Sequence, residues 1–436
     1  MFSRKPRAPK SPELLAAWKA LEAGAVPDAI SLLRDAAEEA PVVETALVVA
    51  RAAEMAGIAE LARAAGAVSS KPGGQELFSF GYACVEAGLP EVAVPVLRDL
   101  LRVAGGQPVV LWELVSAYEA LGRHAEAAEV LAAQGPALPE WPGGYLLVHN
   151  ALLAGDVATA RARHAALAPP ADPEWAGAYA RQSRMVARAA LLDGSDWLGP
   201  TGLRGWQFVM GGTVLGTLSP HGFEQGMTGR YAFLQDEAAL CLLGLRRLKA
   251  LLVTAGVGVR SVSLLPDRDS RILGLVAAGV LGLPVREFAP GEPDTVVVAY
   301  DLNRVGTSEE GAAALAALRT RVPGQVLHEH VSDWTDAPVV TADSVALLAQ
   351  VVTPPWGAAL RVGADGGAER GPADERPEAE VAAGILAAAA STEAAELLPA
   401  DLDLRFTAFA ASVAGLWLDG DRDRLMSTGP VPSNRF

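Results

Sequence analysis

The chain has 436 residues, more than one hydrophobic core normally organises, so we expect at least two domains. Hydrophobic residues make up 51% of the sequence and aromatic residues only 6%, which is typical of helices that pack through small side chains. The formal net charge is −15, with an acidic excess in both halves, so a nucleic-acid backbone is excluded as the expected partner.

The sequence also argues against secretion and membrane insertion. The first ten residues are basic, and no apolar run follows them, so we interpret residues 1–10 as a disordered tail and not as a secretory signal. The longest apolar stretch, residues 272–285, is too short to cross a bilayer. Cys84 and Cys241 each lie in an apolar context, which favours buried free thiols in a reducing compartment. We therefore expect a cytoplasmic protein.

The first half of the chain repeats a glycine and an alanine at a fixed distance. The glycines are Gly24, Gly57, Gly88, Gly122 and Gly155, and each is followed five positions later by an alanine: Ala29, Ala62, Ala93, Ala127 and Ala160. A glycine permits the tight turn after one helix, and a small residue lets the next helix approach closely. A period of 31 to 34 residues therefore predicts a series of helix–turn–helix units.

These units resemble the tetratricopeptide repeat. The match is best over residues 108–139, where Leu111, Leu114, Tyr118, Gly122 and Leu131 fall at the family's positions, and it is weakest over residues 44–69. The resemblance implies an α-α superhelix over residues 11–195. It also implies that the concave face of this solenoid holds another protein or a peptide.

A further helix, predicted over residues 172–192, would close the solenoid. It carries Arg181, Arg184 and Arg188 at helical spacing, so the three would form one basic stripe. The stripe is either a solvated outer face or a contact for an acidic partner segment or for the second domain. Residues 193–196 look like the boundary to that domain, 196–436.

The second domain begins with less regular sequence. Two short apolar runs around Gly211 and Gly212 predict a β-hairpin over residues 206–218. The following loop, residues 219–231, is rich in glycine and contains His221 and Arg230, so it either faces a ligand or is only a surface connection. An amphipathic helix is predicted over residues 233–253.

From residue 261 the pattern alternates between strand and helix. We expect strands at 261–265, 285–288, 295–299 and 325–331, a short one at 339–340, and helices at 270–281, at 311–321 and from residue 343. Continuous apolar strands separated by helices favour a parallel sheet with both faces covered. Ligands of such sheets bind beyond the carboxyl ends of the strands, so the loops after Leu265 and Ala299 are the candidate site.

These two loops resemble those of type I phosphoribosyltransferases. Residues 296–308 combine an apolar strand, Asp301, and a loop with Gly306, Thr307 and Ser308 that enters a helix. The resemblance implies that this loop and helix start hold a sugar phosphate and that Asp301 faces the ribose. Tyr300 stands where the family has its first acidic residue, and Val305 stands in place of a threonine.

The loop after Leu265 resembles the family's pyrophosphate loop, with charged residues in place of its glycines. We expect Asp267, Arg268, Asp269 and Arg271 on one lip of a degenerate pocket, and Asp301 to Ser308, including Arg304, on the other. The pocket would bind a phosphorylated small molecule, or these charges merely solvate loop tips. We predict a multidomain α and α/β interaction scaffold; the alternative is a phosphoribosyltransferase-like enzyme.

No complete catalytic motif, cofactor motif or zinc spacing is present. His328 and His330 alternate on a predicted strand and would point to one face, but no third ligand lies nearby in the sequence, so we predict neither a metal nor a cofactor. Residues 361–377 are interpreted as a flexible insertion, followed by helices at 378–390 and 404–417. We expect the polar tail from residue 419 to be loose, although its end could dock.

Overall fold

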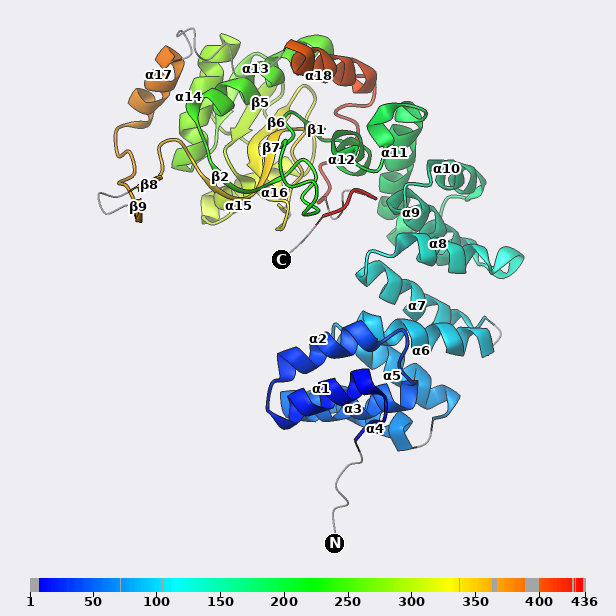
Figure 1. Ribbon diagram of the computed structural model, residues 1–436. Coiled ribbons are helices and arrows are strands. Elements are labelled where there is room, and N and C mark those ends of the chain that lie inside the picture. Colours follow the sequence, from blue (N-terminus) through cyan, green and yellow to red (C-terminus); the bar gives the residue numbers. More distant parts are fainter. Residues whose placement is uncertain are drawn as a thin grey trace. The chain divides into compact units, whose positions relative to one another are not determined.

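The computed structural model describes residues 8–70, 72–103, 106–336, 338–362, 367–388, 400–425, 427 and 429–433. The chain divides into two compact units, Met1–Ala168 and Pro169–Phe436 (Figure 1). The predicted boundary at residue 195 therefore lies too late, since the helix before it belongs to the second unit. Most of the predicted disordered tail lies outside the described residues.

The first unit consists of helices in consecutive pairs. They are α1 (Pro12–Glu22), α2 (Val26–Ala36), α3 (Val42–Ala56), α4 (Ala59–Ser70), α5 (Gly74–Glu86), α6 (Pro90–Val103), α7 (Pro108–Ala120), α8 (His124–Ala132), α9 (Tyr145–Leu153) and α10 (Val157–Ala166). All five repeat glycines lie between the helices of a pair, with φ between +67° and +84°. Four of the five repeat alanines are fully buried and Ala62 is half-buried. The predicted hairpins are thus confirmed.

The stacking of the hairpins is not strictly linear. In a regular stack each hairpin contacts only its neighbours. Here α6 of the third hairpin contacts its partner α5 and the neighbouring helices α3 and α7, but it also contacts α2 of the first hairpin. Its sequence fits this position, because its residues from Val92 to Leu97 are all buried and it therefore lacks a polar face over this stretch. At Gly81 of α5 the backbone approaches α6 so closely that a Cβ would lie 2.6 Å from Leu97.

The second unit opens with two helices. α11 (Ala176–Leu192) packs on α12 (Leu203–Gly211), and both precede a short strand, β1 (Val214–Leu215). The predicted hairpin over residues 206–218 is therefore wrong. Gly212 adopts φ +75° and ends α12, so the paired glycines serve as a helix C-cap and not as a hairpin turn.

The core of the second unit is a parallel sheet. Its strands lie in the order β1, β7 (Ser344–Thr353), β6 (Val326–Ser332), β5 (Thr295–Ala299), β3 (Ser261–Leu264) and β4 (Val285–Glu287). A further strand, β2 (Tyr231–Gln235), pairs with the second half of β7, whereas β1 pairs with its start. The predicted α/β class is confirmed.

Two helices pack against each other on one face of this sheet. α13 (Ala238–Thr254) contacts β6 and β7, and α14 (Arg268–Leu281) contacts β3 and β5. The β5 to β6 crossover contains α15 (Leu302–Val305) and α16 (Glu309–Leu318). Three predictions fail here: residues 233–235, predicted as the start of a helix, belong to β2; residues 339–340 form no strand; and β7 replaces the helix predicted from Asp343. β7 is buried on both faces from residue 344 to 349, so it lacks the alternation that identifies a strand.

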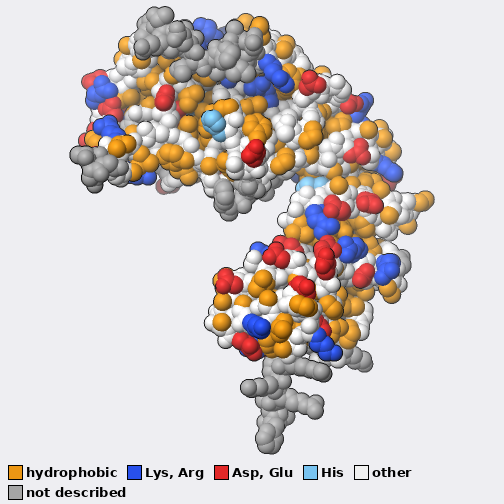
Figure 2. All heavy atoms as spheres, in the orientation of Figure 1, with side chains coloured by type: hydrophobic (Ala, Val, Ile, Leu, Met, Phe, Trp, Pro, Cys, Tyr) orange, Lys and Arg blue, Asp and Glu red, His pale blue; other side chains and the backbone are white. Residues whose placement is uncertain are grey.

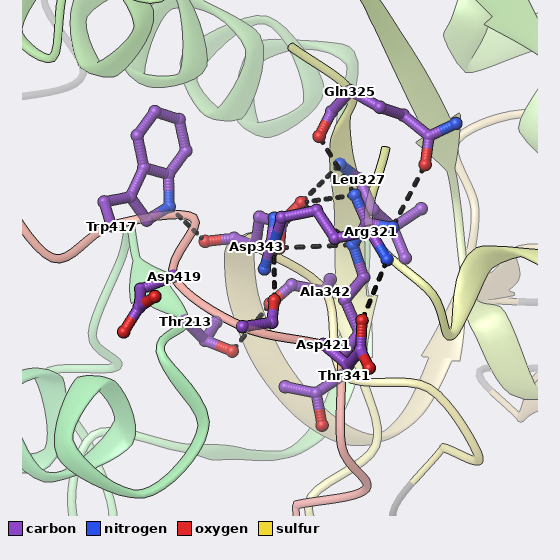
Figure 3. A network of polar contacts seen from close by, with 12 residues as sticks. Thr213, Arg321, Gln325, Leu327, Thr341, Ala342, Asp343, Trp417, Asp419 and Asp421 are labelled. Atoms are coloured by element: carbon purple, nitrogen blue, oxygen red, sulfur yellow. Dashed lines mark hydrogen bonds and ion pairs between the residues drawn. The ribbon is translucent and has the colours of Figure 1, made fainter. Parts of the chain in front are cut away.

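The segment after α18 (Ala400–Val413) is docked and not loose, as Figure 3 shows. Arg422 is 2% exposed and pairs with Asp343 at 3.0 Å, and Arg321 reaches the same carboxylate at 2.7 Å. Arg422 also donates to the carbonyl oxygens of Leu318 and Gln325, at 2.8 and 3.0 Å. The tail thereby ties the end of α16 to the amino ends of β6 and β7.

Two arginines of the stripe on α11 contact the same C-terminal tail. Arg184 pairs with Asp423 at 2.7 Å, and Arg188 donates to the carbonyl oxygen of Asp419 at 3.0 Å. Of the two interpretations of the stripe, contact with the second domain is the correct one for these two residues, while Arg181 is exposed.

The predicted flexible insertion contains a small antiparallel pair, β8 (Leu360–Val362) and β9 (Ala368–Arg370), with residues 363–366 outside the described part. α17 (Glu378–Ala388) follows and packs on α14. No helix among the described residues combines the length and apolarity that crossing a bilayer requires.

Candidate functional site

The strand order reverses where the sequence predicted the site, which is the usual position of a ligand crevice in such sheets. β3 leads to β4 on one side, and β5 leads to β6 and β7 on the other, so the order reverses between β3 and β5. Ligands of open parallel sheets bind at such a reversal, beyond the carboxyl ends of the strands. The loops after β3 and β5 are therefore neighbours, and Arg304 pairs with Asp269 across them at 3.1 Å.

Side chains of the protein itself fill this crevice. The indole of Trp356 donates to Asp269 Oδ1 at 2.6 Å, and its ring packs edge-on against Tyr300 with centroids 5.3 Å apart. Arg304 also donates to the carbonyl oxygen of Val352 at 2.8 Å. A ligand at this position would have to displace Trp356 and break the Arg304–Asp269 pair.

The residues expected to bind phosphate make local contacts. Thr307 donates to the carbonyl oxygen of Arg304 at 2.7 Å, and the Ser308 hydroxyl caps α16 by accepting from the amide of Gly311 at 3.0 Å. Gly306 ends α15. The first turn of α16 also carries Glu309 and Glu310, whose charges oppose an anion at that helix start.

Asp301 and Asp267 have the same structural role in their loops. Asp301 caps α15 by accepting from the amide of Asn303 at 2.9 Å, and Asp267 caps α14 by accepting from the amide of Ser270 at 2.9 Å. Burial raises the pKa of both carboxyls. Burial and the charge of Asp301 also raise the pKa of Glu329, beneath this loop, to about 8, so that Glu329 is protonated at neutral pH.

The other predicted site residues lie away from the crevice. Arg268 donates to the carbonyl oxygens of Asp374 and Arg376, and Arg271 pairs with Glu287 at 2.7 Å. His221 is exposed. Arg230 is 1% exposed and donates to the carbonyl oxygen of Pro432 at 2.9 Å, so it holds the C-terminal tail.

A separate pocket lies beside α13. Its volume is about 840 Å³, and its walls come from β2, α12, α13, α18 and the loop before β2. The predicted ligand-facing loop contributes Pro220, Phe223 and Tyr231 to this wall, but neither His221 nor Arg230. Four arginines line the pocket: Arg204, Arg246, Arg247 and Arg405. Two carboxylates, Asp196 and Glu237, also line it.

Two of these arginines are held in place by backbone carbonyls. Arg204 donates to the carbonyl oxygens of Leu215 and Gly216, at 2.7 and 2.5 Å, and Arg247 donates to that of Gly216 at 3.0 Å. Burial, then the charges of Arg247 and Arg405, lower the pKa of Arg204 to about 10, so it remains charged at neutral pH. A concave, partly aromatic pocket with fixed guanidinium groups suits an organic anion.

A third feature is a buried polar cluster between β2, α13 and β6. Asp236 Oδ2 lies 2.9 Å from His330 Nε2, 3.3 Å from Cys241 Sγ and 2.9 Å from the Tyr300 hydroxyl. Cys241 Sγ lies 3.6 Å from His330 Nε2. All four residues are buried, with Cys241, Tyr300 and His330 at 0% exposure. Both cysteines are buried and free, as predicted.

Sequence reasoning missed this cluster and the arginine-lined pocket. It noted Cys241 and His330 separately, but it placed residues 233–253 in one helix, so Asp236 was not recognised as the residue that follows a strand. Residues 231–235 read Tyr-Ala-Phe-Leu-Gln, an apolar run without polar alternation, so the sequence held no periodic signal for this strand. The arginines of the pocket come from three separate segments and share no sequence pattern.

Comparison of this chain with known protein families, with curated proteins and with solved structures finds no match. The functional proposal therefore rests on the geometry of the molecule.

Proposed function

We propose that the protein is an interaction scaffold whose helical unit binds a segment of another protein. The observation that supports it most directly is a stripe on α5 in which Tyr82 and Glu86 are exposed and Phe78 is half-buried. Phe78, Tyr82 and Glu86 follow one another at intervals of four residues, so they lie on one face of the helix. The rings of Phe78 and Tyr82 stack with centroids 6.5 Å apart, and Tyr82 is 40% exposed.

An acidic pair continues this stripe. Glu113 of α7, which packs against α5, has its pKa raised by partial burial and then by the charge of Glu86, so the two carboxylates are close. Figure 2 shows acidic side chains among hydrophobic ones on the visible face of the helical unit. We call the surface formed by Phe78, Tyr82, Glu86 and Glu113 the α5 surface.

The chemistry of the α5 surface favours a basic partner segment. Two carboxylates held close together repel each other, and a Lys or Arg side chain placed between them replaces this repulsion by attraction. The exposed ring of Tyr82 can add a cation–π contact with such a Lys or Arg side chain, worth about 0.5–1 kcal/mol. We therefore propose a Lys- or Arg-rich peptide segment as the ligand, held in the concave face that the repeat resemblance implies.

Selection of a random peptide library on the full-length chain tests this proposal. We expect enrichment of peptides that carry Lys or Arg, with binding that weakens as salt is added. Reversing both charges of the α5 surface, with Glu86→Lys and Glu113→Lys, should raise Kd at least about tenfold, equivalent to roughly 1.4 kcal/mol.

The matched control changes the same net charge elsewhere in the unit. Glu60 of α4 and Glu129 of α8 are exposed, and the variant with Glu60→Lys and Glu129→Lys should bind within about twofold of the parent, because its contact surface is intact. Enrichment of peptides without basic residues, or an equal loss of affinity in both variants, would contradict the proposed surface.

A second candidate function, for the α/β unit, is binding of a phosphorylated small molecule. The four arginines of the 840 Å³ pocket favour it, and they lie outside the loops that resemble a phosphoribosyltransferase. The enzyme alternative would instead use Asp301 on a ribose and Gly306, Thr307 and Ser308 on a phosphate. It requires the crevice closed by Trp356 to open.

Thermal shifts with phosphoribosyl pyrophosphate and with inorganic phosphate separate these possibilities, since a ligand of the native state raises its stability. We expect a shift that Arg246→Ala abolishes and that Asp301→Ala preserves. The control Arg260→Ala removes an arginine that is exposed at the start of β3, and it should change nothing. Loss of the shift with Asp301→Ala alone would favour the enzyme alternative, and no shift in any variant would reject both.

A further inference from the structure

We propose that Asp236, Cys241 and His330 bind one divalent transition metal ion, Zn²⁺ in the first place, within the α/β unit. The three side chains offer a carboxylate oxygen, a sulfur and an imidazole nitrogen whose atoms all lie within 4.8 Å of one another. These are the ligand types that zinc takes in proteins. The inference is independent of the proposed scaffold function.

The spacing of the ligand atoms fits such an ion. The distances are 2.9 Å from Asp236 Oδ2 to His330 Nε2, 3.3 Å from that oxygen to Cys241 Sγ, and 3.6 Å from the sulfur to the nitrogen. A circle through three atoms so spaced has a radius of about 1.9 Å, so an ion just off their plane can lie at the roughly 2.0–2.3 Å that zinc keeps from O, N and S.

The charge of the site is also balanced. A carboxylate and a thiolate carry two negative charges, which cancel those of a divalent cation, while the imidazole remains neutral. Cys241 would lose its thiol proton to solvent, and His330 would carry its remaining proton on Nδ1. Because the cluster is fully buried, a neutral assembly has a smaller desolvation cost than unpaired charges would have.

The position of the cluster indicates a structural ion. Asp236 follows β2, Cys241 lies in the first turn of α13, and His330 lies within β6, so the ion would join three elements that the hydrogen bonds of Asp236 already bring together. The Tyr300 hydroxyl, 2.9 Å from Asp236 Oδ2, either completes the tetrahedron or donates to the ligating carboxylate. The three ligand residues are buried, which is typical of closed structural sites.

Metal analysis of the full-length chain, purified without a metal-affinity step, tests the inference. We expect about one zinc ion per chain, and a loss of thermal stability after removal by a chelator that added Zn²⁺ restores. After replacement by Co²⁺, a thiolate-to-cobalt charge-transfer band should appear in the near ultraviolet. This band reports a sulfur ligand directly and does not depend on any variant being folded.

The two cysteines provide the matched variants. Cys241→Ser should abolish the charge-transfer band and lower the metal content, whereas Cys84→Ser, at the other buried cysteine, should preserve both. A chain that stays free of metal after dialysis against excess Zn²⁺, or a cobalt form without the band, would overturn the proposal. The cluster would then be only a hydrogen-bonded network around Asp236.

Discussion

Replacing Asp343 by alanine is expected to lower the free energy of unfolding of the α/β unit by about 3–5 kcal/mol, because it leaves buried guanidinium charge without its carboxylate. Arg422 is 2% exposed, and Asp343 accepts from its Nε and Nη2 at 3.0 Å each as well as from the amide of Leu327 at 2.8 Å. The loss should appear in calorimetry as a lower transition temperature of this unit. It should also appear as faster hydrogen exchange in β6 and β7.

The control is an ion pair on the surface. Asp374 and Arg376 approach to 2.6 Å, but Arg376 is exposed and Asp374 only half-buried, so Asp374→Ala should leave the transition almost unchanged. If Asp343→Ala lowered the transition temperature as little as Asp374→Ala, the network in Figure 3 would not be what holds the tail in place.

From the ion pairs of Asp343 we also expect the stability of the α/β unit to depend on pH. Burial by itself would raise the pKa of Asp343, but Arg422 and Arg321 outweigh it and hold the pKa below its usual value. A carboxyl with a depressed folded-state pKa stabilises the fold above the unfolded pKa of about 3.9, and this contribution is lost as the pH falls through the folded value. We expect Asp343→Asn to be less stable than the parent at neutral pH, with a difference that shrinks below about pH 4.

The second large effect is expected in the helical unit. Phe80 of α5 is 0% exposed and belongs to the core that runs from Leu14 to Leu147. Phe80→Ala should cost about 3–5 kcal/mol, from lost burial together with the cavity that remains. Hydrogen exchange in peptides from α5 and α6 should accelerate, since these two helices form one hairpin.

Tyr82 provides the matched control on the same helix. It lies two residues further along and is 40% exposed, so Tyr82→Ala should cost less than about 1 kcal/mol while it weakens peptide binding at the α5 surface. Equal destabilisation by both variants would mean that α5 is not oriented as described. Loss of peptide binding with Phe80→Ala alone would place the ligand elsewhere.

The helical hairpins could be predicted because their signal is local. Each of the turns at Gly24, Gly57, Gly88, Gly122 and Gly155 needs a residue that tolerates positive φ, and the alanine five positions later must fit against the helix before it. Both requirements act between residues near in sequence. The irregular position of α6 was not predicted, because contact with α2 depends on residues about sixty positions away.

The sequence predicted that the loops after β3 and β5 lie together, but not the side-chain contacts between them. That the loops after β3 and β5 are neighbours follows from the alternation of strands and helices, together with the rule for where such sheets bind ligands. That Trp356 and Arg304 close the crevice does not follow, since Trp356 comes after β7 and its partner Asp269 lies 87 residues earlier. The failed predictions at Gly212 and Asp343 have a related cause: a glycine pair and an Asp-Ser pair each suit more than one local structure, and packing selects between them.

The sequence by itself determined the class of each unit, the hairpin period and the strand and helix alternation, because backbone propensity and hydrophobic periodicity are encoded within a few neighbouring residues. Only the tertiary structure decided the unit boundary at residue 168, the docking of the tail through Arg422, and the meeting of Asp236, Cys241 and His330. The three residues converge because α13 packs against β6 and β7 while β2 pairs with β7, and no short window of sequence contains that information.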